Sequence, residues 1–219
     1  MSQRTEAKAR TREALLDAAR TVIGRNGLHA SRLDLIAAEA GFSTGAVYAS
    51  FNGKDDLFTA LIDREVVRFL SEFAAVVEQG SDVADRSQRA IRALLDYLER
   101  EPDFFVLVME LWSRAIHEEA FQTFYLERRA LITQALALIL EEGARSSGRE
   151  LVLPALKIAT VVEALGEGIA LRFLADPGTV SSDDFDEIAE LLSGALTRPS
   201  TATGEDGPSA AGRGERDTA

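Results

Sequence analysis

Apolar residues recur at helical spacing through the first quarter of the chain, in short segments separated by turn residues. The first segment places one apolar stripe on a single helix face, made of Leu15, Leu16, Ala19, Val22 and Ile23. Glycine favours the left-handed conformation that ends many helices, so Gly27 is predicted to end this one. The second segment begins at Ser31, where Asp34 completes a capping-box pattern, and ends at Gly41. Its inward side chains are Leu33, Ile36, Ala37 and Ala40.

A third helix, only about two turns long, is predicted directly after these two, with Ser43 as its N-cap. Two helices joined by a three- or four-residue turn that contains glycine form the helix-turn-helix motif, whose second helix enters the major groove of DNA. This pattern over residues 12–57 is the strongest functional indication in the sequence. The spacing alone is weak evidence, because many buried helix pairs share it.

The rest of the chain also shows helical periodicity. The predicted helices run from Lys54 to about Gln79, Arg86 to Arg100, Asp103 to His117, Glu119 to about Ala144, Leu153 to about Ala175, and onward from Ser181 or Ser182. Residues 80–85 are predicted to form a turn, and residues 145–148 a flexible connection. All five prolines lie at or next to the ends of these helices or in the tail, where helical proteins tolerate proline. No segment shows sustained two-residue alternation, so we expect an all-α fold without a sheet.

The N-terminal residues resemble the DNA-binding domain of the TetR family of bacterial transcriptional regulators. The positions that fit the family pattern are Arg12, Leu15, Leu16, Ala18, Ala19, Gly27, Ile36, Ala37, Ala40, Gly41, Ser43, Gly45, Tyr48, Phe51, Lys54 and Leu57, with Phe42 and Val47 as apolar variants. The resemblance implies a three-helix helix-turn-helix head on a larger helical ligand-binding and dimerisation domain. We therefore expect a DNA-binding head with a basic arm over residues 1–54, a helical domain over residues 55–198, and a disordered tail over residues 199–219.

DNA contacts are expected from the second and third helices. Base edges should be met, chiefly through small apolar contacts, by Thr44, Gly45, Ala46 and Ala49. Phosphates should be held by Ser31, Arg32, Ser43, Tyr48, Ser50 and Lys54. The sequence departs from the family pattern at Arg32, where Thr or Ser commonly caps the helix, and at Thr44, Ala49 and Ser50. Because the third helix is poor in long hydrogen-bonding side chains, no operator sequence is predicted.

The net charge of −12 is unevenly distributed. Residues 1–55 contain eight basic and six acidic residues, a net charge of +2, whereas the remainder contains sixteen and thirty, a net charge of −14. The basic residues near the predicted DNA side are Arg4, Lys8, Arg10, Arg12, Arg25, Arg32 and Lys54. A basic head on an acidic body orients itself toward phosphate. Without the helix-turn-helix, an ordinary solvated helix start would explain the basic arm better.

The last two predicted helices suit a homodimer interface. Residues 153–175 are apolar on most helix faces and contain glycines, each of which costs roughly 1 kcal/mol relative to alanine, so close approach of another helix would compensate. In the TetR family the last two long helices form a four-helix dimer interface, and a two-fold DNA site requires two heads. The expected interface residues are Ala159, Gly166, Gly168, Phe185, Ile188, Leu192 and Leu196. The alternative is that both helices only complete a monomer's core.

Aromatic residues between the head and the dimer helices are candidates for a ligand pocket, although most such stripes are ordinary core. The resemblance implies a pocket among the fifth to eighth helices for a small-molecule effector. The candidates are Phe69, Phe73, Tyr97, Phe105, Met109, Trp112, Tyr125, Glu163 and Phe173. Glu163 lies one turn from Glu167 on an apolar helix, so this pair would attract a cationic compound unless it is a solvated edge.

The sequence offers little support for an enzyme, a cofactor or a metal site. It has no phosphate-binding glycine loop, no nucleophile elbow and no zinc motif, no cysteine, and only two widely separated histidines. It also lacks an apolar run long enough for a membrane span. We expect a cytoplasmic, ligand-responsive repressor released from a palindromic double-stranded DNA operator by a small, largely apolar molecule. The rival hypothesis is a helical architectural or interaction protein that binds DNA without an effector.

Overall fold

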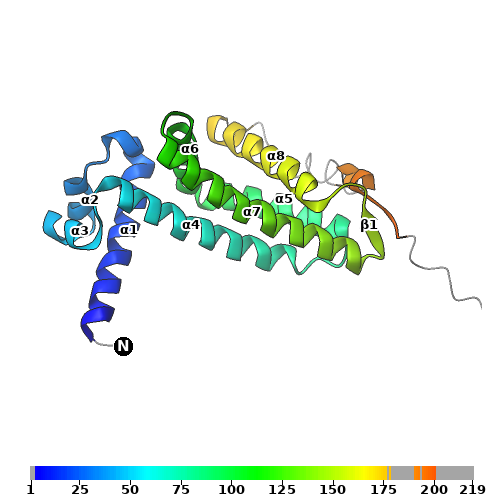
Figure 1. The fold of residues 1–219 in the computed structure, drawn as a ribbon, viewed down its shortest axis with the longest axis horizontal. Helices are drawn as coiled ribbons and strands as arrows, with labels where there is room; N and C mark the ends of the chain where they lie inside the picture. The colour runs from blue at the N-terminus through cyan, green and yellow to red at the C-terminus, as the bar shows by residue number, and fades with distance from the viewer. Residues whose placement is uncertain (1–2, 177, 179–189, 193, 201–219) are drawn as a thin grey trace, which may run out of the picture.

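The computed structural model describes residues 3–176, 178, 190–192 and 194–200. The helices are α1 (Gln3–Ala30), α2 (Leu33–Glu39), α3 (Thr44–Ser50), α4 (Lys54–Val77), α5 (Val83–Arg100), α6 (Pro102–His117), α7 (Glu119–Ser146) and α8 (Ala155–Ala175). Residues 190–192 and 194–196 are also helical. Figure 1 shows α1–α3 as a head at one end, with α4 running from it into an elongated body of α5–α8. The predicted all-α class is confirmed.

Glycines end the helices of the head as predicted. Gly27 interrupts α1 with φ 73° and ψ 162°, a conformation that is essentially restricted to glycine. After α2, Gly41 has φ 73°, its N–H donates to the Ala38 carbonyl (3.1 Å), and the Phe42 N–H donates to the Ala37 carbonyl (2.9 Å). This pair of bonds is the Schellman motif, which satisfies the last carbonyls of a helix.

The predicted capping role of Ser31 is wrong. Arg32 occupies the N-cap position of α2 and makes no side-chain capping bond. Ser31 is instead fully buried, and its hydroxyl lies 2.7 Å from the Gly27 carbonyl and 3.2 Å from the Val22 carbonyl. The serine therefore closes the break at the end of α1 rather than the start of α2.

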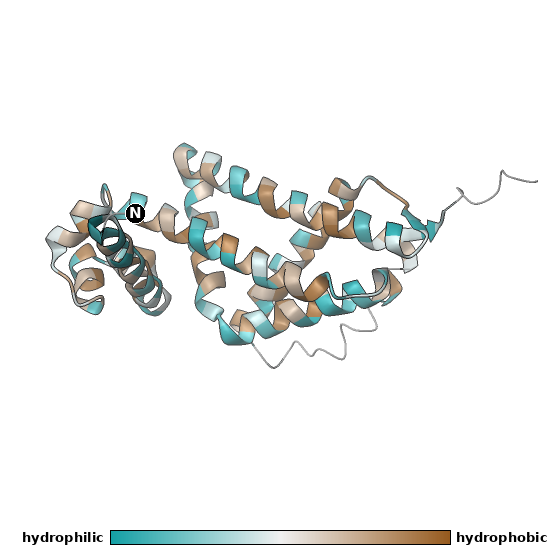
Figure 2. Cartoon of the chain, turned by 90° about the horizontal axis from the view of Figure 1, so that it is seen from below, coloured by the Kyte–Doolittle hydropathy of each residue, from teal (hydrophilic) through white to brown (hydrophobic). Residues whose placement is uncertain are grey.

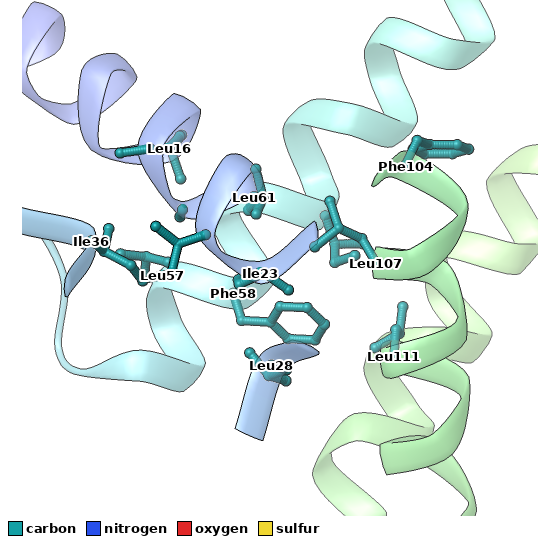
Figure 3. Close-up of a cluster of buried hydrophobic side chains, with 14 of the residues drawn as sticks. Leu16, Ile23, Leu28, Ile36, Leu57, Phe58, Leu61, Phe104, Leu107 and Leu111 are labelled. Carbon is teal, nitrogen blue, oxygen red and sulfur yellow. The ribbon is translucent and has the colours of Figure 1, made fainter. Parts of the chain in front are cut away.

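One continuous apolar core joins the head to the body. Figure 3 shows side chains of α1, α2, α4 and α6 pointing toward one another at this junction, among them Leu16, Ile23, Ile36, Leu57, Phe58, Leu61, Leu107 and Leu111. The first half of α4 belongs to the head core, and its second half packs in the body. A displacement of α4 or α6 is therefore transmitted across the junction, since close-packed interiors deform little.

The body helices lie close to their predicted ranges, with two differences. α5 begins at Val83 rather than Arg86, because the Asp82 carboxylate accepts a bond from the Asp85 N–H (3.0 Å) and caps it. Arg149–Leu151 forms strand β1, which pairs in antiparallel fashion with β2 (Thr197–Pro199), so the expectation of no sheet is wrong. Each strand has three residues, which is too short for a two-residue alternation to be recognised in the sequence.

Hydrophilic positions are distributed along the body helices together with hydrophobic ones (Figure 2). Within the described part of the chain, no helix is long and apolar enough to cross a membrane. The predicted tail beyond residue 200 and most of the predicted last helix, including Phe185 and Ile188, lie outside the described residues.

Candidate nucleic-acid interface and ligand cavity

The outer face of α3 is exposed and formed mainly by small side chains. Val47 is fully buried and anchors the helix, while Tyr48 on the next position is 62% exposed. The other fully or partly exposed residues of this face are Ser43, Thr44, Gly45, Ala46, Ala49 and Ser50. A Cβ at Gly45 would meet only the Ser43 hydroxyl at 3.6 Å, so packing within the protein does not require glycine there. The face is free to approach another molecule closely.

Arg12 fixes the end of α3 against α1. Its Nη1 donates to the Ser50 carbonyl (2.8 Å), and its guanidinium lies 4.2 Å from the centre of the buried Phe51 ring. A cation at a helix C-terminus is favourable because the unpaired carbonyls carry negative partial charge. Arg12 therefore positions α3 and is engaged within the protein, although the sequence grouped it with the basic arm.

Two of the predicted phosphate contacts are held by neighbours. Arg32 forms a bidentate pair with Asp34 at 3.1 and 2.6 Å, on the exposed side of α2. The Lys54 ammonium donates to the His29 carbonyl (3.1 Å), and partial burial lowers the pKa of Lys54 from its usual value despite the adjacent Asp55. Both cations lie at the surface of the head, where a phosphate can replace or join the present partner.

The basic arm is the exposed first part of α1. Arg4 and Lys8 lie one turn apart, Arg10 follows, and all three side chains are exposed. Within the described residues none of them has an ion-pair partner. The sequence identified this charge, but the helix that carries it begins earlier than the apolar pattern indicates, because residues 3–10 contribute no buried side chain.

A cavity of about 120 Å³ lies in the body, remote from α3. Its wall is almost entirely apolar and comes from α4, α5, α7, α8 and the last described helical residues. The residues that line it are Phe73, Val77, Arg86, Ser87, Ala90, Ile91, Leu136, Ile139, Leu140, Gly143, Val162, Leu192 and Leu196. Of the predicted pocket residues, Phe73 is in this wall. The aliphatic residues of the wall were not predicted as pocket residues, because their spacing is that of ordinary core helices.

The other predicted pocket residues lie elsewhere. Phe69, Tyr97 and Phe105 pack on one another and on Phe104, with ring centres 5.0–6.3 Å apart. Burial raises the pKa of Tyr97 to about 12, as expected for a phenol in an apolar core. Phe173 packs against the same core, Met109 is partly buried, and Trp112 is half exposed on α6.

Glu163 is already paired with α7 and is not in the cavity wall. Thr133 donates its hydroxyl to the carboxylate (2.6 Å), and Arg129 lies 3.6 Å away while also donating to the Tyr125 hydroxyl (2.8 Å). Burial raises the pKa of Glu163, against the opposing effects of Thr133 and Arg129. The positive partner of Glu163 is therefore Arg129 of the same chain, and not a cationic ligand as predicted.

The predicted dimer residues separate into inward and outward positions. Ala159 is fully buried between α7 and α8, and a Cβ at Gly166 would meet Leu94 of α5 at 3.5 Å. Gly168 is exposed and has nothing within 4 Å of a Cβ. Leu192 and Leu196 line the cavity.

An exposed apolar stripe runs along α8 on the same side as Gly168. Its members were not predicted individually, and they are Leu156, Val161, Leu165 and Leu171, which are 48–59% exposed. They are five, four and six residues apart and lie on the same half of the helix surface, at 3.6 residues per turn. Their signal was concealed because α8 is apolar on nearly all faces.

An ionic cluster ties the head to the body beside the aromatic core. Arg20 of α1 and Arg68 of α4 both bond to Glu101, between α5 and α6. The fully buried Glu65 accepts two bonds from Arg64, at 3.0 and 2.7 Å. Burial alone would raise the pKa of Glu101, but the two arginines outweigh burial and lower it. The sequence did not indicate this cluster, because its members come from distant segments.

Two family models match the chain. The model described as bacterial regulatory proteins, tetR family, matches residues 15–61, which contain most of the head and the start of α4. The model described as BetI-type transcriptional repressor, C-terminal, matches residues 83–196, more than half of the chain.

Curated and solved proteins agree with these models. The HTH-type transcriptional regulator BetI of Vibrio parahaemolyticus is 30% identical over 174 residues, covering 77% of this chain and 83% of the relative. A putative transcriptional regulator of Saccharomonospora viridis, solved with choline, has a TM-score of 0.72 at 20% identity, covering 87% of this chain and 99% of that one. FadR of Bacillus subtilis, solved with stearoyl-CoA, has a TM-score of 0.69 at 18% identity, covering 83% and 96%.

Proposed function

The chain belongs to the TetR family of bacterial transcriptional regulators, and we propose that it represses transcription from a two-fold symmetric operator until a small, largely apolar molecule binds its body. DNA binding and transcriptional regulation follow from membership of the family. Repression, release by an effector and the residues that carry each step are the proposal. No catalysed reaction is part of it, and its site of action is the cytoplasm because its target is chromosomal DNA.

The exposed face of α3 is the observation that supports this function most directly. We assign base-edge contacts to Thr44, Gly45, Ala46 and Ala49, whose small side chains allow the helix to lie deep in a major groove. Phosphate contacts are assigned to Arg32, Ser43, Tyr48, Ser50 and Lys54 and, from the exposed start of α1, to Arg4, Lys8 and Arg10. Ser31 is left out because its hydroxyl is buried.

The α8 stripe is the proposed dimer surface. Exposed leucine and valine side chains on one side of α8 favour pairing with a second copy. An operator with two half-sites also requires two heads. We divide the chain into a head over residues 1–54, a ligand-binding and dimerisation domain over residues 55–198 and a tail over residues 199–219, with α4 starting at the boundary. Gly168 belongs to the proposed interface, whereas Ala159 and Gly166 support it from inside the protomer.

The cavity is the proposed effector site. The solved relatives with choline and with stearoyl-CoA are regulators that hold small molecules, which favours an effector for this chain too. α4 connects the two ends, because Lys54 begins it in the head and Val77 ends it in the cavity wall. The alternative of an architectural DNA-binding protein predicts a filled body core, and the apolar cavity favours the regulator over it.

Selection of bound duplexes from a randomised pool tests the DNA-binding part. The enriched sites should be palindromes, with half-site centres about 10 base pairs, or a multiple of this, apart. Tyr48→Ala should weaken binding to the selected site. Leu165→Glu should place charges on the proposed dimer surface and yield monomers by light scattering, which bind a palindrome no better than a half-site.

Val67→Glu is the matched control for the dimer surface, because Val67 is an exposed apolar residue on α4. It should leave both the mass and the selected palindrome unchanged. Recovery of no enriched sequence, or a wild-type protein that is monomeric at micromolar concentration, would contradict the proposal.

A further inference from the structure

The charges around the cavity limit which ligand it accepts. Arg86 is the one charged side chain among the described residues that line it, and no described carboxylate does so. Apart from Arg86 and Ser87, the lining side chains are hydrocarbon or aromatic, and the exposed wall itself is almost entirely carbon. The Arg86 guanidinium can therefore meet a ligand only at the edge of the cavity. A buried group that carries a positive charge would lose hydration and gain no partner in such a wall.

Arg86 is held at the turn between α4 and α5. Its Nε donates to the Gly80 carbonyl (3.1 Å), and its backbone packs close to Gly80, where an added Cβ would lie 2.9 Å from the Arg86 nitrogen. The two Nη groups make no hydrogen bond or ion pair with the described residues. They therefore retain the paired donors with which arginine binds a carboxylate.

The acidic residues nearest in sequence are already engaged. Asp82 caps α5 through the Asp85 N–H, and Asp85 pairs with Arg89 (2.9 Å) and accepts from the Ser81 N–H (2.9 Å). Glu163, next to the lining residue Val162, is bonded to Thr133 and Arg129 of α7 and is not among the residues that line the cavity. None of these carboxylates neutralises Arg86 or receives a cationic ligand in the cavity.

We infer that the cavity binds the hydrocarbon chain of a short- to medium-chain carboxylic acid, with its carboxylate paired to Arg86, and that it rejects cationic amphiphiles. The cavity volume of about 120 Å³ suits a short hydrocarbon chain. This inference rests on the proposed function, since it names the ligand class of the proposed effector site.

Three compounds with one chain and different head groups test the inference: hexanoate, 1-hexanol and hexyltrimethylammonium. Calorimetric titration of the full-length protein at about 0.15 M salt, where long-range charge effects are screened, should rank them in that order. Hexanoate should bind about ten-fold more tightly than hexanol, the usual gain from a charge-assisted hydrogen bond. Hexyltrimethylammonium should show no measurable binding.

Variants separate the head group from the chain. Arg86→Gln should reduce hexanoate affinity to that of hexanol and leave hexanol binding unchanged, which shows that the cavity is intact. Arg89→Gln, one turn along α5, removes the same charge outside the wall and should leave the ranking unchanged. Ala90→Phe fills the cavity and should abolish binding of both hexanoate and hexanol.

The outcomes distinguish this inference from the proposed function. Preferred binding of hexyltrimethylammonium, or an unchanged hexanoate affinity in Arg86→Gln, overturns the ligand class and leaves the cavity as the effector site. Binding that survives Ala90→Phe, or binding of none of the three compounds, overturns the assignment of this cavity to an acyl chain. Loss of operator binding is measured separately and is the test of the regulator itself.

Discussion

Arg32, on the proposed DNA side of the head, already has an acidic partner. The Arg32–Asp34 pair is exposed, with 74% of the Arg32 side chain and 46% of the Asp34 side chain accessible. Exposed pairs contribute only about 0–1 kcal/mol, since water and salt screen them. A DNA phosphate can therefore displace Asp34 at small cost, and Asp34 reduces the charge that the head presents to DNA.

Asp34→Asn should tighten binding to duplex DNA of any sequence, because Arg32 then has no acidic competitor. The dependence of log K on log salt should steepen by up to about 0.9, the contribution of one phosphate contact. Fluorescence anisotropy over a salt series measures the slope. Asp96→Asn, which removes an exposed carboxylate of α5, is the control and should change neither quantity. A wild-type slope for Asp34→Asn would show that Arg32 does not reach a phosphate.

Glu101 makes the stability of the protein depend on pH. Its pKa is lower in the folded state than its usual 4.5, because Arg20 and Arg68 outweigh the effect of burial. A carboxyl whose folded-state pKa is lowered stabilises the fold above its unfolded-state pKa, and this stabilisation is lost as pH falls through the folded-state value. The pKa of Glu101 is lowered, and not raised, because both of its partners are arginines.

Glu101→Gln should therefore lower the free energy of unfolding at pH 7 and flatten its decline on acidification between about pH 5 and 3. Urea unfolding at fixed protein concentration, across that pH series, gives the curve. Glu99→Gln replaces an exposed neighbour on α5 and should reproduce the wild-type decline. Parallel curves for wild type and Glu101→Gln would mean that the arginine bonds do not persist in solution.

Single residues differ in how far sequence alone predicts them. Gly41 was predicted correctly because the backbone conformation it permits is a property of the residue itself. The role of Ser31 depends on the break in α1 and on the Val22 and Gly27 carbonyls, which only the folded chain brings to its hydroxyl. The ionic cluster around Glu65 and Glu101 likewise joins distant segments, and no local sequence pattern indicates it.

At the scale of elements, the helices were predictable and the strands were not. Helices α4 to α8 lie within a few residues of their predicted ranges, because each carries an apolar stripe several turns long. β1 and β2 pair across 48 or so residues of chain, through contacts such as Arg149 Nε to the Thr197 hydroxyl (2.7 Å). The cavity is similarly non-local, since α4, α5, α7, α8 and the later residues Leu192 and Leu196 all contribute to its wall.

Helix α6 holds the head more directly than the sequence indicated. Glu110 accepts a bond from the Leu28 N–H (3.0 Å) at the break in α1. Arg114 donates to Asp55 (2.6 Å) beside Lys54, and its guanidinium lies 3.5 Å from the centre of the Phe121 ring of α7. α6 is therefore a second connection between the body and the DNA side, in addition to α4.

Arg114→Ala should weaken the effect of an effector on DNA binding without removing either binding activity. Residues between two coupled sites typically change the coupling by about 0.5–2 kcal/mol, or about 2- to 30-fold. The measurement is the ratio of operator affinities with and without the hexyl compound that binds most tightly. Arg145→Ala removes an exposed arginine at the end of α7 and is the control. An unchanged ratio in Arg114→Ala would assign the coupling to α4 alone.

At the scale of the whole molecule, α4 spans the distance between the two proposed sites. Its 24 residues extend about 36 Å at 1.5 Å per residue. Its first turns pack in the head core through Leu57, Phe58 and Leu61, and Phe73 and Val77 near its end line the cavity. A ligand that shifts the far end of this helix moves the head rather than being absorbed by loose packing.

In a dimer, such a shift changes the separation of the two heads, which must match successive major grooves about 34–36 Å apart. The effect must be reciprocal, because the same coupling free energy links both equilibria. Operator DNA should therefore weaken ligand binding by the factor by which ligand weakens operator binding, about 5- to 150-fold for typical couplings of 1–3 kcal/mol. Titration of hexanoate with and without the selected operator measures the first factor, and operator titration at saturating hexanoate measures the second. Equal hexanoate affinity in both titrations would mean that ligand in the cavity does not affect the heads. The Ala90→Phe variant, whose cavity is filled, should then match wild type in operator binding at every hexanoate concentration.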